Sequence, residues 1–130
     1  MSRPLKFYLA FNKGLKVIRT DGGSSAESDE FFSGRTLEHL MGCYQTPEVV
    51  FAAVAFDGGY RTEDGGRSWH KVLDGDVRTF TADPHDDRIV YAGTGPIRLF
   101  RSEDNGLHFQ PMDAQVRPGK EHDKPSDRNS

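Results

Sequence analysis

Short apolar runs, separated by clusters of Gly, Pro, Asp and Asn, fill the chain between residues 5 and 112. Runs of about four to eight residues bounded by such turn-forming positions predict β-strands. We expect strands at 5–12, 15–20, 27–32, 35–44, 49–56, 60–62, 68–73, 77–82, 89–94, 97–102 and 108–112. The pattern therefore predicts an all-β chain whose strands are joined by tight turns.

Some local assignments stay open at this level. The segment 35–44, RTLEHLMGCY, also fits a short helical stripe, although Gly42 and Cys43 do not extend it. The sequence DGG at 57–59 predicts a hairpin turn, and DPHDD at 83–87 predicts a polar turn. The repeat described next decides in favour of a strand at 35–44.

Two eight-residue stretches match at a spacing of forty residues: TEDGGRSW at 62–69 and SEDNGLHF at 102–109. In each, a glycine allows the positive φ of a tight turn, an aspartate can accept hydrogen bonds from turn amides, and an aromatic can anchor the following strand in the core. An aromatic-Arg pair precedes both stretches, and VVFA at 49–52 matches IVYA at 89–92 with the same spacing. The positions with these structural roles are Thr62, Asp64, Gly66, Ser68 and Trp69 in the first stretch and Ser102, Asp104, Gly106 and Phe109 in the second.

A degenerate third copy lies upstream. Asp21, Gly23 and Ser25 keep the spacing of the motif, but Arg19 replaces the hydroxyl residue and Ala26 replaces the aromatic. Because the next apolar pair comes only at 31–32, we expect an insertion that displaces the last strand of this unit.

The pattern [S/T]-x-D-x-G-x-[S/T]-[W/F] resembles the Asp-box, or BNR repeat, of sialidases, xyloglucanase-type glycoside hydrolases, sortilin-type receptors and photosystem assembly factors. The stretch 62–69 matches every defined position, and 102–109 departs once, at His108. A repeat of about forty residues rich in strands is typical of β-propeller blades. The resemblance implies that the box lies on the hairpin between the third and fourth strands of a blade and has a structural role.

The predicted fold is thus an incomplete β-propeller of four-stranded antiparallel Asp-box blades. We expect a partial first blade at 1–34, a second blade at 35–75, a third blade at 76–113 and a disordered polar tail at 114–130. Closed propellers have about four to eight blades, and unpaired sheet edges favour association. We therefore expect self-association, or further blades supplied in trans by other chains, unless the sequence is a truncated copy of a larger protein.

The composition argues against some classes of binding partner. The 130 residues carry a net charge of −3, which argues against electrostatic binding of nucleic acid or of a membrane surface. Cys43 is the one cysteine and is expected to be a small buried hydrophobe. The first residues do not resemble a signal peptide, and no apolar run is long enough to cross a membrane, so a cytoplasmic location is expected.

No catalytic, metal-binding or cofactor-binding residue is predicted. Sialidase-like chemistry would, by resemblance, require an arginine cluster, a Tyr-Glu pair and an acidic proton donor. Arg61 and Arg101 are instead equivalent repeat positions, and the run His85-Asp86-Asp87 fits a turn better than a metal site. We expect a non-catalytic scaffold that binds a protein or carbohydrate. The alternative is part of a glycoside hydrolase, exo-sialidase or xyloglucanase-like, whose active site needs further blades.

Overall fold

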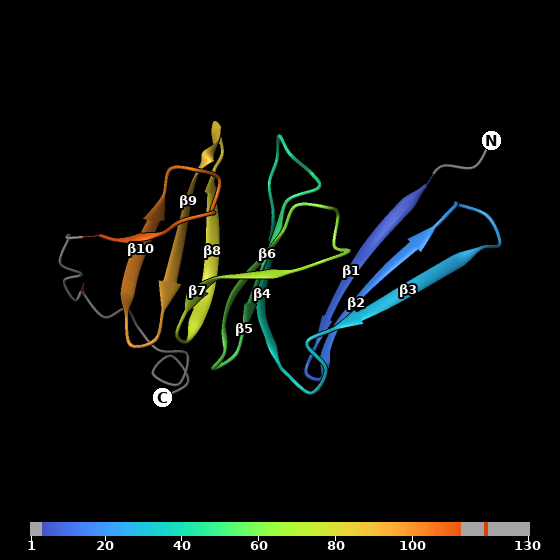
Figure 1. Ribbon diagram of the computed structural model, residues 1–130, viewed down its shortest axis with the longest axis horizontal. Coiled ribbons are helices and arrows are strands. Elements are labelled where there is room, and N and C mark those ends of the chain that lie inside the picture. Colours follow the sequence, from blue (N-terminus) through green and yellow to red (C-terminus); the bar gives the residue numbers. More distant parts are fainter. Residues whose placement is uncertain (1–3, 113–118, 120–130) are drawn as a thin grey trace, which may run out of the picture.

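The computed structural model describes residues 4–112 and residue 119, and these residues form three antiparallel sheets placed side by side (Figure 1). The first sheet contains β1 (Leu5–Phe11), β2 (Gly14–Thr20) and β3 (Ala26–Phe31). The second contains β4 (Leu37–Gly42), β5 (Val50–Val54), β6 (Gly58–Thr62) and β7 (His70–Asp74). The third contains β8 (Val77–Asp83), β9 (Asp86–Thr94), β10 (Arg98–Ser102) and β11 (Gln110–Pro111).

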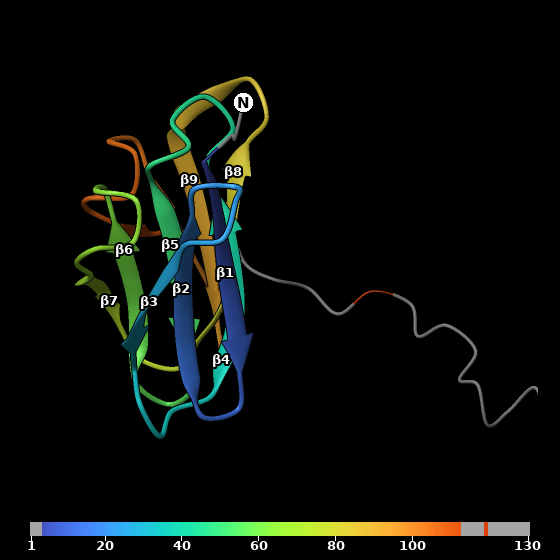
Figure 2. The ribbon, with the colours of Figure 1, turned by 90° about the vertical axis from the view of Figure 1, so that its right-hand side faces the viewer.

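Within each sheet the strands pair in the order of the sequence, as expected for blades built from consecutive hairpins. Seen from the end of the first sheet, the sheets lie one behind another (Figure 2). The prediction of an all-β, propeller-type fold is confirmed. The segment 35–44 forms a strand, β4, in agreement with the repeat and not with the helical stripe.

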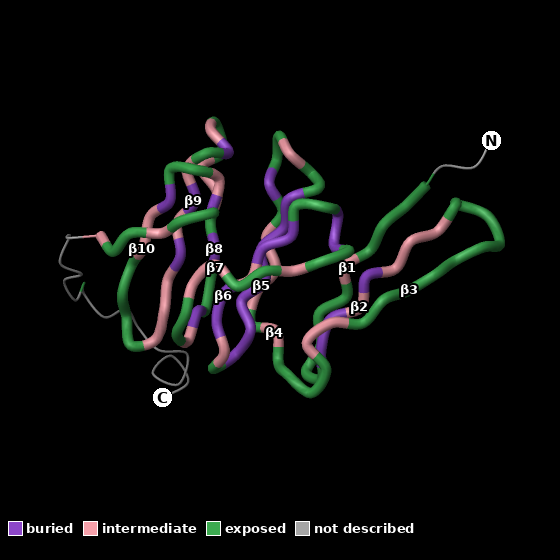
Figure 3. Tube along the Cα trace, viewed as in Figure 1, coloured by how far each residue is buried: buried purple, intermediate pink, exposed green. Residues whose placement is uncertain are grey.

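The core lies between the second and third sheets. The rings of Phe51 in β5 and Phe80 in β8 stack with their centroids 5.0 Å apart, and both side chains are fully buried. Small residues on β5 and β9, Ala53 and Ala92, leave room for these rings. Buried positions are accordingly concentrated on the second sheet and its neighbours, while β1 and β3 are exposed along most of their length (Figure 3).

Three local predictions need correction. The hairpin turn expected at 57–59 lies at 55–57, and Gly58 and Gly59 already belong to β6. Gly59 is needed there because a Cβ at this position would collide with the ring of Phe80. The polar turn expected at 83–87 is reduced to residues 84 and 85, because β8 and β9 pair as far as Asp83 and Asp86.

The third correction concerns the first sheet. Its last strand is not displaced by an insertion, because β3 begins at Ala26 and pairs with Thr20 directly after the turn. The three strands of this sheet correspond to the second, third and fourth strands of a blade. The predicted tail, 114–130, lies outside the described residues except for Gly119. The described part of the chain contains no helix long and apolar enough to cross a membrane.

Candidate inter-blade binding site

The second-sheet box (62–69) connects β6 to β7 and is closed by Asp64. Its Oδ1 accepts hydrogen bonds from the backbone amides of Arg67 (3.0 Å) and Ser68 (2.9 Å) and from the Thr62 hydroxyl (2.7 Å), while Oδ2 accepts from the Ser68 hydroxyl. The Thr62 hydroxyl in turn accepts from the amide of Gly66 at 2.9 Å. The hydroxyl of Ser68, with the backbone amides and Thr62, holds the pKa of Asp64 well below its usual range.

The third-sheet box (102–109) connects β10 to β11 and repeats this arrangement with one substitution. Asp104 Oδ1 accepts from the Ser102 hydroxyl (2.7 Å) and from the amides of Leu107 (3.1 Å) and His108 (2.9 Å). Its Oδ2 lies 2.7 Å from Nδ1 of His108, so the imidazole takes the place of the serine hydroxyl of the other box. Burial acts to raise the pKa of Asp104, but the bonds from Ser102 and His108 outweigh it and hold the pKa well below its usual range.

The hairpin after β2 is built differently. Asp21 Oδ1 accepts from the amides of Gly23 (2.7 Å) and Ser25 (3.4 Å), and the Thr20 hydroxyl accepts from Gly22 (3.0 Å). Residues 21–25 therefore form a short turn capped by an aspartate. They lack the longer excursion of a box, in which strand pairing resumes only at His70.

The box aromatics fill the spaces between sheets. Trp69 packs in an edge arrangement against Tyr8 and Phe32, with centroid distances of 6.4 and 5.8 Å, and lies 6.2 Å from Phe31. These contacts join the first sheet to the second. Phe109 lies 6.0 Å from Phe80 and packs against the core between the second and third sheets.

In the first and second sheets, an arginine on the strand before the turn or box reaches the box of the next sheet. Arg19 in β2 donates from Nη2 to the carbonyl of Gly65 at 3.3 Å. Arg61 in β6 donates from Nε to the carbonyl of Asn105 at 3.0 Å and from Nη2 to its side-chain oxygen at 2.6 Å. Gly65 and Asn105 are equivalent box positions. The sequence identifies Arg61 and Arg101 as equivalent repeat positions, but its assignment of Arg19 to the hydroxyl position of the motif is wrong. Thr20 supplies that hydroxyl, and Arg19 corresponds to Arg61 because the turn after β2 is shorter than a box. The function of these arginines as links between sheets becomes visible only once the sheets are packed.

The box glycines complete each junction because they lie directly on the preceding sheet. A Cβ at Gly66 would come within 2.9 Å of the Tyr8 ring, and a Cβ at Gly106 would collide with the ring of Phe51. Each junction thus combines an arginine that binds a box carbonyl with a side chain that packs on the box glycine.

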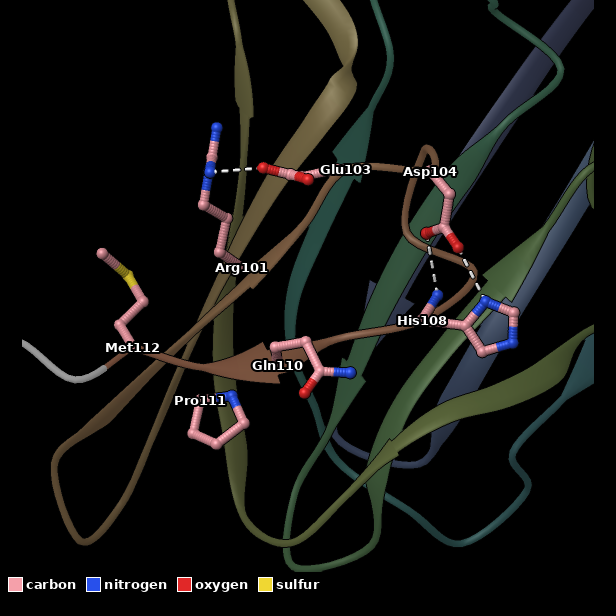
Figure 4. A pocket seen from close by; sticks show the side chains of 7 residues that line it. All are labelled: Arg101, Glu103, Asp104, His108, Gln110, Pro111 and Met112. Atoms are coloured by element: carbon pink, nitrogen blue, oxygen red, sulfur yellow. Dashed lines mark hydrogen bonds and ion pairs between the residues drawn. The ribbon is translucent and has the colours of Figure 1, made fainter.

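Among the described residues, no further sheet lies against Arg101, the equivalent arginine of the third sheet. Its Nη1 pairs with Glu103 at 2.6 Å, and its Nε has no hydrogen-bond partner among the described residues. A groove of about 600 Å³ lies beside it (Figure 4). The groove is lined by Arg101, Glu103, Asp104, His108, Gln110, Pro111 and Met112.

A buried carboxylate, that of Asp87, adds to the junction between the second and third sheets. Asp87, which the sequence places in a turn, is buried in β9 and accepts hydrogen bonds from the amide of Gln45 (2.7 Å) and the hydroxyl of Thr46 (3.1 Å). Asn105 also donates to the carbonyl of Asp87 at 2.8 Å. Cys43 is buried close by, at 4% exposure, and burial raises the pKa of its thiol. Nothing in the sequence around Asp87 distinguishes it from an ordinary turn aspartate.

Arg61 does not converge with Arg101 on a common ligand, because it is bound to the third-sheet box. Within residues 4–112 and 119, no three His, Cys, Asp or Glu side chains are grouped so that they could hold a metal ion.

Comparisons with known proteins agree with this geometry at the level of the fold. No protein-family model and no curated protein matches the sequence. The structure of YCF48 bound to D1 peptide matches with a TM-score of 0.58 and 19% identity over 82% of this chain. The GH74 xyloglucanase from Xanthomonas campestris matches with a TM-score of 0.64 and 19% identity over 85% of this chain.

The fold is that of β-propeller blades. Over most of its length the chain is structurally similar to two proteins of the Asp-box propeller type. It spans only part of each of them, 36% of the YCF48 chain and 22% of the xyloglucanase chain.

Proposed function

We propose that the chain is a non-catalytic scaffold of propeller-type blades that acts by binding a protein at an exposed blade face. The observation that carries this proposal is the position of Arg101. The equivalent residues Arg19 and Arg61 each bind the box of a neighbouring sheet, whereas Arg101 presents the same group beside an open groove.

The carboxylates at the groove support a structural role. A glycoside hydrolase needs one carboxylic acid that can donate a proton and a second carboxylate on the other side of the scissile bond. Asp104 is unsuited to donate a proton because its lowered pKa keeps it ionised, and its oxygens are occupied by the turn. Glu103 is paired with Arg101. The boxes thus use their charged groups to hold the blade together.

A protein ligand is favoured over a carbohydrate. YCF48, one of the similar structures, was solved with a bound peptide, and the groove presents a guanidinium that in this fold binds backbone carbonyl oxygens. The alternative, part of a glycoside hydrolase, draws its support from the likeness to the xyloglucanase. It would require catalytic carboxylates from blades other than these three.

An activity assay separates the two functions. The purified chain should show no turnover of xyloglucan or of a fluorogenic sialoside above a buffer blank. Glu103→Gln is the matched variant, because it removes the carboxylate of the groove that is not part of a box turn. Turnover by the wild-type chain that is lost in Glu103→Gln would show an enzyme and would overturn the scaffold proposal.

A further inference from the structure

We propose that the binding partner at the Arg101 end is a second copy of this chain, docked head to tail through its first sheet. This inference rests on the proposed scaffold function and names the protein that fills the open groove. It is argued from two surfaces: the third sheet presents the arginine and the aromatic ring that form the internal junction, and the first sheet presents an apolar face beside a turn with a box-like backbone position.

The end formed by the third sheet carries the donor half. Arg101 pairs across the strands with Tyr91, as Arg61 pairs with Phe51 in the second sheet. At the internal junction, the ring of Phe51 receives the box glycine Gly106 and Arg61 binds the neighbouring carbonyl. The register therefore places an aromatic ring and a guanidinium in the same relation on the open face. We call this surface the open arginine face; it comprises Thr81, Tyr91, Leu99, Arg101 and Gln110.

The end formed by the first sheet carries the acceptor half. Gly22 follows Asp21 as Gly65 follows Asp64 and Asn105 follows Asp104, and the three residues share a left-handed backbone, with φ of 81°, 71° and 62°. The turn after β2 is shorter than a box, so Gly22 lies one residue nearer to its arginine than Gly65 and Asn105 do. In the proposed contact the carbonyl of Gly22 accepts from Arg101 of the second copy. The short turn lacks the box aromatic but keeps this position.

The outer surface of the first sheet is also apolar. Alternate residues of β1 point away from the second sheet, since Tyr8, on the other face, contacts Trp69. These outward residues, which we call the apolar outer face, are Leu5 (51% exposed), Phe7 (47%), Leu9 (49%) and Phe11 (38%). A run of four large apolar side chains on one exposed sheet face indicates a surface that is covered by a partner.

A second copy can cover both the open arginine face and the apolar outer face. Docking the apolar outer face of one chain on the open arginine face of another leaves the same pair of surfaces free at the far ends, so a second such contact can close the assembly. Two copies of the three described sheets together supply six blades, which lies within the range of about four to eight found in closed propellers. A different partner protein would cover one of the two faces and leave the other exposed.

The first test is the mass of the purified full-length chain in solution, measured by light scattering over a range of concentrations. We expect a species of twice the chain mass of 14.6 kDa. A monomer at all concentrations would overturn the second-copy proposal. Growth into large species without a limit would also overturn it, because the contact would then not close.

Two single substitutions test which surfaces are used. Phe7→Ser and Arg101→Ala should each shift the chain towards the monomer, at least tenfold in dissociation constant. Tyr44→Ser is the control for Phe7→Ser, since Tyr44 is 87% exposed and lies outside both faces. Arg98→Ala is the control for Arg101→Ala, because strand alternation places Arg98 on the opposite face of β10. Circular dichroism checks that each variant is folded.

Mixing the two disrupted variants decides the orientation. Phe7→Ser retains an intact open arginine face, and Arg101→Ala retains an intact apolar outer face. A head-to-tail contact therefore predicts that the mixture forms heterodimers at a total concentration at which each variant alone is mostly monomeric. A mixture that stays monomeric, or a dimer of wild-type chains insensitive to Arg101→Ala, would overturn the proposal. A wild-type monomer without glycosidase activity would refute the second copy and leave the scaffold function standing.

Discussion

Arg61 in the second sheet binds Asn105 in the third-sheet box with two hydrogen bonds across 44 residues of sequence, to its backbone carbonyl and to its side-chain oxygen. Arg61 is buried, at 6% exposure, and its guanidinium also lies 6.0 Å from the centroid of the Phe51 ring. One side chain thus joins two sheets through polar and aromatic contacts. These contacts hold the second and third sheets against each other.

Replacing this arginine should loosen the junction. We expect Arg61→Ala to lower the free energy of unfolding by about 2–3 kcal/mol, because two bonds to a charged donor are lost and the partly buried carbonyl of Asn105 loses this partner. Arg88→Ala is the matched control. Arg88 is paired with Asp86 but its side chain is 77% exposed, so a much smaller loss than for Arg61→Ala is expected. Urea unfolding measures both, and equal losses would contradict the role of Arg61.

The box aspartates should make the free energy of unfolding depend on pH in the acidic range. Hydrogen bonds lower the pKa of Asp64 and Asp104 in the folded chain, so their contribution is complete above the unfolded value of about 3.9. It is lost as the pH falls through the folded values. We expect the wild-type chain to lose stability from about pH 4 downwards, and Asp64→Asn to show a smaller loss over this range. Unfolding curves between pH 2 and 6 that are parallel for the two proteins would refute this.

Substitutions at His108 test whether a serine hydroxyl can replace the imidazole in the third-sheet box. We expect His108→Ser to be as stable as the wild type, because a serine hydroxyl makes the equivalent bond in the second-sheet box. His108→Ala should lose about 0.5–1.5 kcal/mol, since Asp104 then loses a side-chain donor. The control is His70→Ala, which removes an exposed imidazole outside the box. A loss on His108→Ser as large as that on His108→Ala would show that the hydroxyl cannot replace the ring.

The sequence predicts those features that depend on local chain geometry. The spacing of Asp64 and Gly66 predicts a turn whose hydrogen bonds all lie within eight residues. Further copies of this motif can therefore be found in the sequence without knowledge of how the sheets pack. The exact extent of the turns before β6 and β9 could not be predicted, because it depends on the Phe80 ring against Gly59 and on pairing across β8 and β9.

The contacts between sheets could not be predicted for the same reason. The partner of Arg61 lies in another blade, and Asp87 resembles any polar turn residue until Gln45 and Thr46 are brought against it. Recurrence of Arg19, Arg61 and Arg101 before each turn was the available signal. It marks a position common to all units, but which neighbour that position meets depends on the stacking of the sheets.

Trp69 is expected to hold the first sheet in place. Trp69→Ala should lower stability by about 3–5 kcal/mol through the cavity left between Tyr8, Phe31 and Phe32. The loss should be local: amide exchange should rise in β1–β3 while β8–β10 stays protected, because Trp69 does not belong to the core formed by Phe51 and Phe80. Uniform loss of protection in all three sheets would contradict this division.

Gly106 allows backbone strain to be separated from collision between sheets. Its φ is +81°, and a Cβ there would collide with the ring of Phe51. Gly34 has nearly the same φ, +79°, and a Cβ there would meet nothing within 4 Å. Gly34→Ala should therefore cost only the left-handed strain of about 1–2 kcal/mol.

Gly106→Ala should cost that strain plus the overpacking of a filled junction, for a total of about 2–5 kcal/mol. Because the backbone term is shared, the difference between the two variants reports how tightly the third-sheet box lies on the second sheet. Thermal and urea unfolding of both variants measure this difference. If Gly34→Ala and Gly106→Ala lose equal stability, the box can move away from Phe51 without cost, and the close packing of successive blades would not be what holds the sheets together.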